Sequence, residues 1–212
     1  LIDSGAGSTD NINRLGLPMN RLQGLLLTHF HSDHIAEIYE VNLASWIQAR
    51  PQPLTIYGPQ GVDEVTNGVN ASYRQDRIYR TGHHGEDMLP SALGVLQHKT
   101  IAAGVILEDG DLKISAYVAE HPPIEPAVGY RFDYRGRSIV ISGDSNVNGD
   151  TLKIVDGADL LLHDALSLPT VTALSDAMGA VGQSRQSKIV ADVMDYHAST
   201  DSLIELGEKS NV

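Results

Sequence analysis

Four potential metal ligands lie within six residues directly after an apolar run, and this stretch constrains the fold more than any other. Leu25, Leu26 and Leu27 follow Gly24, and the chain continues Thr-His-Phe-His-Ser-Asp-His to residue 34. A short continuous apolar run is typical of a strand covered on both faces, as in a sheet flanked by helices. The sequence therefore predicts a buried strand that ends in a ligand-bearing loop.

The spacing of these polar residues suits metal binding. Because alternate residues of an extended segment point the same way, His29 and His31 can bind one ion together. Asp33 and His34 follow, and a carboxylate between imidazoles suits a second ion or a water shared by two ions. Chance clustering of surface histidines is the alternative, and it is disfavoured because His-x-His-x-Asp-His is far more specific than one His-x-His pair.

The composition is that of an ordinary globular chain. With 212 residues, 42% of them apolar, the chain can bury a sizeable core. This length favours one domain or a tight pair of halves, and we expect one domain. No apolar run approaches the roughly 20 residues of a membrane span, so we expect a soluble protein with no membrane partner. The sequence has no cysteine, so any metal site must consist of histidine and aspartate. No signal peptide or targeting segment is visible, and the lack of cysteine does not decide between cytoplasm and periplasm.

The net charge of −12, from 27 acidic and 15 basic residues, opposes binding to nucleic acid, because that affinity rests mainly on phosphate neutralisation. We therefore expect a small anionic or ester substrate and regard nucleic acid as the less favoured partner. Arginines do gather locally, since Arg74, Arg77 and Arg80 share roughly one face of a predicted helix. They either clamp an anionic group or form a solvated face paired with acidic neighbours, and the second interpretation is favoured.

Further predicted strands also end in ligand residue types. Residues 114–121 are a strand candidate that ends at His121, and a predicted hairpin over residues 128–142 precedes Asp144. A carboxylate has two oxygens and can bind two ions, whereas a turn or helix cap is the alternative for Asp144. Residues 158–165 form another buried-strand pattern, which contains His163.

These segments together resemble the metallo-β-lactamase superfamily of metal-dependent hydrolases. Within it the chain is most similar to the branch that contains ribonuclease Z and the arylsulfatase-like and phosphodiesterase-like hydrolases. The Tyr-Gly-Pro-Gln-Gly element at residues 57–61 and the Leu-Leu-His-Asp-Ala element at residues 161–165 agree with this resemblance. It implies an α/β fold (α+β by some schemes), namely an αββα sandwich of two mixed β-sheets with outer helices, formed by a single domain over residues 1–212.

The resemblance also implies a ligand set for two ions. His121 matches the third histidine of the first ion, and Asp144 matches the carboxylate that bridges both ions. The expected cofactor is Zn²⁺, with two ions in a complete site. Mn²⁺ and Fe are alternatives, because His and Asp ligands accept them too. The predicted metal ligands are His29, His31, Asp33, His34, His121 and Asp144.

Two more residues match positions that support the chemistry in this family. His197, in the segment Tyr-His-Ala-Ser-Thr, matches a histidine proposed to contact the substrate or assist proton transfer. Its alternative role is that of a loop residue before a helix. Asp3 matches an early supporting aspartate, with a turn residue as the equal alternative. The predicted catalytic residues are Asp33 and His197, and we expect His163 to support the site without binding metal.

The sequence departs from the family pattern in three places. The strand that ends in Asp-x-Gly starts at residue 1, so we expect N-terminal strands and any leader peptide to be lacking. The family's final ligand histidine has no counterpart before Val212, which leaves the second ion only Asp33, His34 and Asp144. The site is then incomplete, holds one ion, or takes a ligand from another chain. Ser32 stands where ribonuclease Z typically has glycine.

The expected function is hydrolysis of a phosphodiester, sulfate or related ester by a metal-bound hydroxide. A metal-binding fold with little or no turnover is one alternative, and a ribonuclease Z-like endonuclease that processes tRNA 3′ ends is another. A homodimer is left open. Chelation separates the hydrolase from a structure in which the histidines are inert, because metal removal would leave the stability of the latter unchanged.

Overall fold

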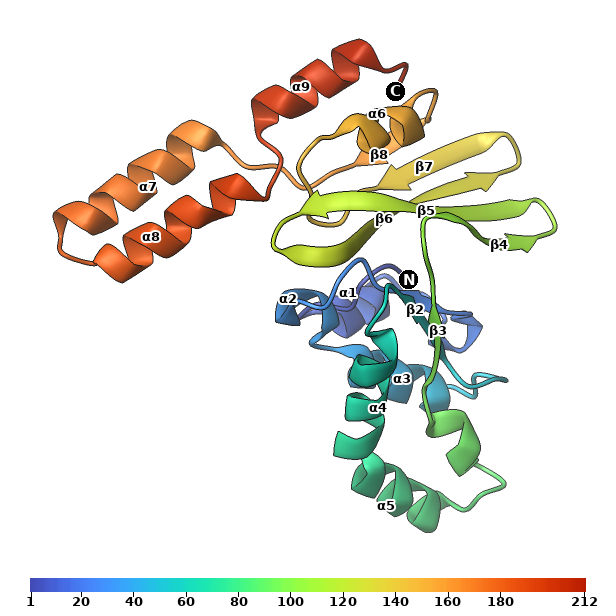
Figure 1. Cartoon of the computed structure of the whole chain (residues 1–212). Coiled ribbons are helices and arrows are strands. Elements are labelled where there is room, and N and C mark those ends of the chain that lie inside the picture. Colours follow the sequence, from blue (N-terminus) through green and yellow to red (C-terminus); the bar gives the residue numbers. More distant parts are fainter. The chain divides into compact units, whose positions relative to one another are not determined.

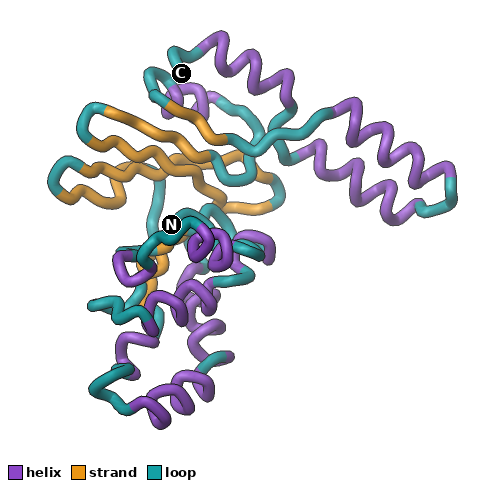
Figure 2. Tube along the Cα trace, turned by 180° about the vertical axis from the view of Figure 1, so that it is seen from behind, coloured by secondary structure: helices purple, strands orange, loops and turns teal.

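Two separate β-sheets organise the chain, one in each of its two units. The computed structural model describes residues 1–212, and the units comprise Leu1–Ile101 and Ala102–Val212. Figure 1 shows the elements of both units in sequence colours, and Figure 2 shows them by type. The single domain expected from the sequence stays a prediction.

The first unit contains a three-stranded parallel sheet. Its strands are β1 (Leu25–Leu26), β2 (Thr55–Gly58) and β3 (Gln97–Thr100), in the order β1-β2-β3. Parallel neighbours require crossover connections, and helices fill the connections here. The helical segments are α1 (Ser8–Arg14), η1 (Met19–Arg21), α2 (Ser32–Ile35), α3 (Ile38–Ile47), α4 (Val62–Ser72), α5 (Arg74–His84) and η2 (Ser91–Gly94).

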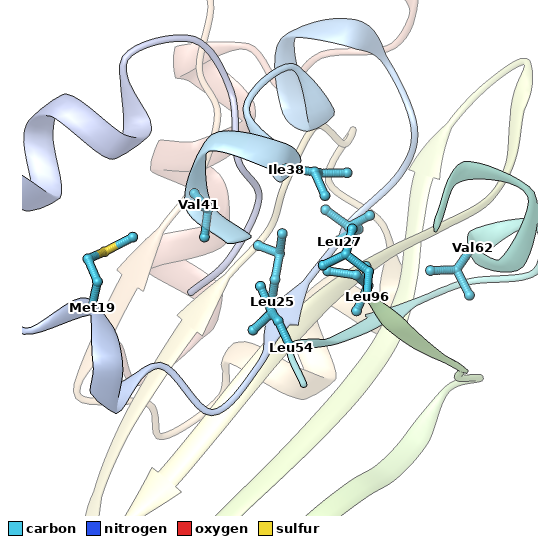
Figure 3. Close-up of a cluster of buried hydrophobic side chains, with 9 residues drawn as sticks. Met19, Leu25, Leu27, Ile38, Val41, Leu54, Val62 and Leu96 are labelled. Carbon is cyan, nitrogen blue, oxygen red and sulfur yellow. The ribbon is translucent and has the colours of Figure 1, made fainter. Parts of the chain in front are cut away.

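The predicted buried strand is the centre of the first unit's core. Leu25 and Leu27 are fully buried and Leu26 is 7% exposed, so side chains on both faces of β1 are covered, as the apolar run predicted. The surrounding side chains come from helices and neighbouring strands (Figure 3). The cluster consists of Met19, Leu25, Leu27, Ile38, Val41, Leu54, Ile56, Val62 and Leu96. The ligand loop therefore starts from a closely packed base.

The helical pattern that follows the ligand loop is interrupted. Residues 35–47 have helical spacing, yet the structure divides this stretch into α2 and α3, with Glu37 as the residue before α3. The Glu37 backbone N–H donates to the Ser4 carbonyl at 2.8 Å, and its carboxylate accepts the N–H groups of Gly7 at 2.6 Å and Thr9 at 2.9 Å. These long-range hydrogen bonds fix the position of the break between α2 and α3.

The second unit contains a five-stranded mixed sheet. Strands β4 to β7 are antiparallel neighbours, and β8 pairs in parallel with β7. The predicted hairpin is confirmed, because β6 and β7 are joined by Arg135 and Gly136, both with positive φ, as a tight hairpin turn requires. The strands are β4 (Gly104–Asp109), β5 (Leu112–His121), β6 (Ile124–Tyr134), β7 (Arg137–Ile141) and β8 (Leu160–Leu162).

The helices of the second unit follow the sheet. Helix α6 (Gly149–Val155) connects β7 to β8 and starts with a capping box made by Asn148 and Thr151. The antiparallel pair α7 (Leu168–Ala180) and α8 (Ser184–Asp192) extends away from this unit's sheet (Figures 1 and 2). The turn η3 (Val193–Asp195) and helix α9 (Thr200–Lys209) complete the chain.

The prediction of two β-sheets with helices is thus confirmed, with the correction that the first sheet is entirely parallel. None of the helices combines the length and the apolar character that a membrane span requires.

Candidate metal centre

The ligand loop after β1 brings two histidines together, as their spacing predicted. His29 is buried, and its Nε2 lies 2.9 Å from Nδ1 of His31. Two nitrogen ligands of one tetrahedral zinc ion are separated by roughly 3.3 Å, since each Zn–N bond is about 2.0–2.1 Å. The two imidazoles therefore need only a small adjustment to share an ion.

A carboxylate orients the other half of this loop. Asp3 accepts the Thr28 N–H and hydroxyl, each at 2.8 Å, and its Oδ2 lies 2.7 Å from Nδ1 of His34. Such carboxylate–histidine contacts fix a ring so that its other nitrogen faces a metal. Asp33 Oδ2 lies 3.7 Å from His34 Nε2, and the Asp33 side chain is 77% exposed. Asp3 thus contacts the ligand loop, as expected of a supporting residue.

In the second unit, a candidate ligand residue lies at or just after the end of each of β5 and β7. His121 is 2% exposed and closes β5, while Asp144 follows β7. The hydroxyl of Ser145 accepts the Glu120 N–H at 3.0 Å, and Glu120 forms a bridge with Asn146. This link holds the two strand ends together, so that ligand atoms of His121 and Asp144 lie within 4.8 Å of each other.

His197 lies beside these ligands on the segment before α9. Its Nδ1 is 2.8 Å from Oδ2 of Asp164, and its Nε2 is 4.0 Å from Oδ2 of Asp144. The His197 and His121 rings are 5.5 Å apart. A bridge between Leu166 and Ser199 holds this segment against the chain after β8.

Asp164 lies among the candidate site residues, and it was not singled out from the sequence. Its carboxylate accepts the Ser145 N–H at 3.2 Å and contacts both His163, at 2.9 Å, and His197. We expected support from His163, which is 3% exposed, but the residue that reaches His197 is the next one. The sequence signal that could have found Asp164 is its position, since it is a polar residue two places after the last residue of β8.

A buried tyrosine lies near the same carboxylate. Burial, followed by the charge of Asp164, raises the pKa of Tyr117 above its usual range. The Tyr117 hydroxyl is buried and has no hydrogen-bond partner. Tyr117 therefore stays protonated and is an uncharged buried side chain of the second unit.

The donor set fits a transition-metal ion. The candidate ligands provide imidazole nitrogens and carboxylate oxygens only, a combination suited to zinc, manganese or iron. Within each unit candidate ligand residues lie near one another, and His34 and His121 are each oriented by an oxygen partner. For example, the Tyr196 carbonyl lies 3.1 Å from Nδ1 of His121. Whether ligands of the two units bind the same ion stays a prediction.

Comparison with known proteins identifies the family. A family model described as "Beta-lactamase superfamily domain" matches residues 1–197. Ribonuclease Z of Mycobacterium bovis is 32% identical over 216 residues, which cover 100% of this chain and 72% of that protein. Ribonuclease Z of Mycobacterium avium is 29% identical over 215 residues, with the same two coverages.

Solved structures share the fold. The short form of human tRNase Z aligns with a TM-score of 0.54 at 22% identity, over 94% of this chain and 82% of that one. The long form of RNase Z from yeast aligns with a TM-score of 0.64 at 15% identity, over 100% and 30%. Zn²⁺-bound PqqB from Methylobacterium extorquens aligns with a TM-score of 0.52 at 18% identity, over 85% and 59%. The chain has the α/β metallo-β-lactamase fold and belongs to the metallo-β-lactamase superfamily of hydrolases, with relatives named ribonuclease Z.

Proposed function

We propose that this chain is a metal-dependent phosphodiesterase of the ribonuclease Z type, which hydrolyses RNA and in particular the 3′ end of a tRNA precursor. The observation that carries the proposal is the 32% identity to a ribonuclease Z along the whole chain. The matched region includes the ligand loop at residues 29–34, His121, Asp144 and His197. This function replaces the small ester hydrolase as the first candidate.

On the resemblance to this family, His29, His31 and His121 would hold a first ion, and Asp33 and His34 would hold a second. Asp144 would be a ligand of both, because a carboxylate has two oxygens. When bound, ions of this kind lower the pKa of water toward neutrality and stabilise the charge that develops on the phosphoryl oxygens. Asp3 keeps the His34 ring in its ligand orientation.

His197 is proposed to carry the proton. Its Nδ1 faces the Asp164 carboxylate at 2.8 Å, so the N–H on Nδ1 donates to Asp164 and Nε2 is left to exchange a proton with the substrate. Asp164 fixes the orientation of the His197 ring. The leaving ribose oxygen then takes its proton from Nε2 of His197.

A hydrolase of small phosphodiesters or sulfate esters is the second candidate. The net charge of −12 favours it, since an acidic protein repels a polyanion. Ser32, in place of the glycine typical of ribonuclease Z, points in the same direction.

The test compares three substrates on the zinc-loaded chain: a tRNA precursor with a 3′ extension, bis-p-nitrophenyl phosphate and an aryl sulfate. The proposal expects chelator-sensitive cleavage of the tRNA precursor at one position, with Asp144→Ala as the inactive control. Turnover of either small substrate without tRNA cleavage would support the second candidate. Failure on all three would leave only a metal-binding fold with little or no turnover.

A further inference from the structure

The three arginines of α5 have three different environments. Arg80 Nε donates to Asp76 at 2.7 Å, and Asp76 also accepts the hydroxyl of Tyr39. Arg77 is 8% exposed, whereas Arg74 is exposed to solvent. The interpretation favoured from the sequence, a solvated face paired with acidic neighbours, therefore holds for Arg80 alone. Arg74 and Arg77 need a separate explanation.

Arg77 is held in place by one edge of its guanidinium group. Its Nη2 donates to the Asn70 carbonyl at 2.7 Å, near the end of α4. Asn70 is fixed in turn, because its side chain makes two hydrogen bonds with the backbone of Leu96, at 2.9 and 3.0 Å. The other terminal nitrogen, Nη1, is buried and has no hydrogen-bond partner. An unsatisfied buried donor on a charged group is costly, so a ligand that accepts from it would be stabilised.

A pocket is present beside this guanidinium. Arg74 and Arg77 supply two cations, Ser91 supplies a hydroxyl, and apolar side chains complete the wall. The Glu86 carboxylate accepts a hydrogen bond from the Ser91 N–H at 2.8 Å and so fixes the position of Ser91. Figure 1 shows α5 at the end of the first unit remote from α2 and its ligand loop. The lining residues are Arg74, Arg77, Ile78, Ser91, Ala92 and Val95.

We propose that this pocket binds a phosphate group through Arg74, Arg77 and Ser91. A phosphate presents several oxygens, and guanidinium groups bind such oxygens through paired, charge-assisted hydrogen bonds. The exposed apolar side chains of Ile78 and Val95 offer a surface for the organic part of a phosphate ester. The phosphate belongs either to the backbone of an RNA or to a free phosphate compound. Only the RNA source rests on the proposed function.

The test is a titration of the ¹⁵N-labelled, zinc-loaded full chain with inorganic phosphate, followed by NMR. We expect saturable shifts of the Nε–H signals of Arg74 and Arg77 and of the Ser91 amide. Arg74→Gln should weaken this binding by about tenfold, the loss of one charge-assisted contact. Arg14→Gln is the matched control, because Arg14 is an exposed arginine of α1 in the same unit and the charge change is identical. Arg74 is chosen because Arg77→Gln can disturb the fold.

A second titration with a short single-stranded RNA identifies the source. Shifts of the same signals, and a higher KM for RNA in Arg74→Gln at unchanged kcat, would assign the pocket to the RNA backbone. Shifts with phosphate alone would assign it to a free phosphate compound. The proposal is overturned if no signal around α5 moves, or if Arg74→Gln and Arg14→Gln weaken binding equally. Absence of chelator-sensitive hydrolysis would refute the proposed function and leave the phosphate titration unaffected.

Discussion

The Asp164 carboxylate connects three neighbours at the scale of single residues. It accepts the Ser145 N–H next to Asp144 and contacts the rings of His163 and His197. Asp164 therefore links His197, the proposed proton carrier, to the segment after β7 that contains the proposed ligand Asp144. A neutral amide at residue 164 would keep the shape and lose the charge.

We predict that His197→Ala lowers kcat by about 10²–10⁴-fold, the usual contribution of a positioned acid or base. Asp164→Asn should lower kcat as well, because the His197 ring loses the carboxylate that fixes its orientation. Metal content, measured in parallel, should not change. Asp176→Asn on the exposed surface of α7 is the matched control. Full activity in Asp164→Asn would remove that residue from the proposed mechanism.

The proposed ligands make a separate prediction. His31→Ala and Asp144→Ala should each lower the zinc content and abolish hydrolysis, while the circular dichroism of the fold is partly retained. The matched control is His83→Ala, because His83 is exposed on α5. Elemental analysis after gel filtration is the measurement. Wild-type zinc content in both ligand variants would refute the site assignment.

At the scale of elements, Glu37 joins the start of α1 to the break between α2 and α3. Hydrogen bonds from Thr9 and Gly7 lower the pKa of its carboxyl below the ordinary value of 4.5. A carboxyl whose pKa is lower in the folded state contributes stability above its unfolded pKa and loses that contribution as pH falls through the folded pKa.

Glu37→Gln should therefore lower the free energy of unfolding by about 0.5–1 kcal/mol near neutral pH, a value that allows for solvent screening. The difference from wild type should shrink as pH falls below 4.5 through the lower folded pKa. Urea unfolding across this pH range measures it. A difference independent of pH would mean that the ionised carboxylate is not the stabilising form.

Close packing between β5 and β6 gives another prediction. Tyr117 lies opposite Gly129, and a Cβ at Gly129 would collide with the tyrosine ring. Gly129→Ala should destabilise the protein by about 1–3 kcal/mol, the usual cost of overpacking. Gly68→Ala on α4 is the control, since nothing lies within 4 Å of its Cβ position and alanine favours a helix. Equal stability of the two variants in denaturant unfolding would contradict the predicted clash.

At the scale of the whole molecule, the sequence predicted what depends on local pattern. The buried strand at Leu25–Leu27, the hairpin around Gly136 and the proximity of His29 to His31 each follow from neighbouring residues. The break at Glu37 did not, because the partners of that residue lie 28 and 30 residues away. The contact between Asp164 and His197 spans 33 residues and was missed for the same reason.

Charge is the property of the whole chain that most limits the proposed substrate. A chain of net charge −12 requires local cations to approach RNA, and Arg74 and Arg77 supply two of them. Bound divalent ions would reduce the negative charge further. RNA binding should therefore weaken with added salt, and it should weaken on chelation.

The central claim is that a dinuclear metal site performs hydrolysis. The most direct measurement is metal content per chain by elemental analysis, paired with hydrolysis of bis-p-nitrophenyl phosphate before and after chelation. We predict two ions per chain and turnover that chelation abolishes and added zinc restores. Two ions without turnover, or turnover that persists after complete metal removal, would contradict this account.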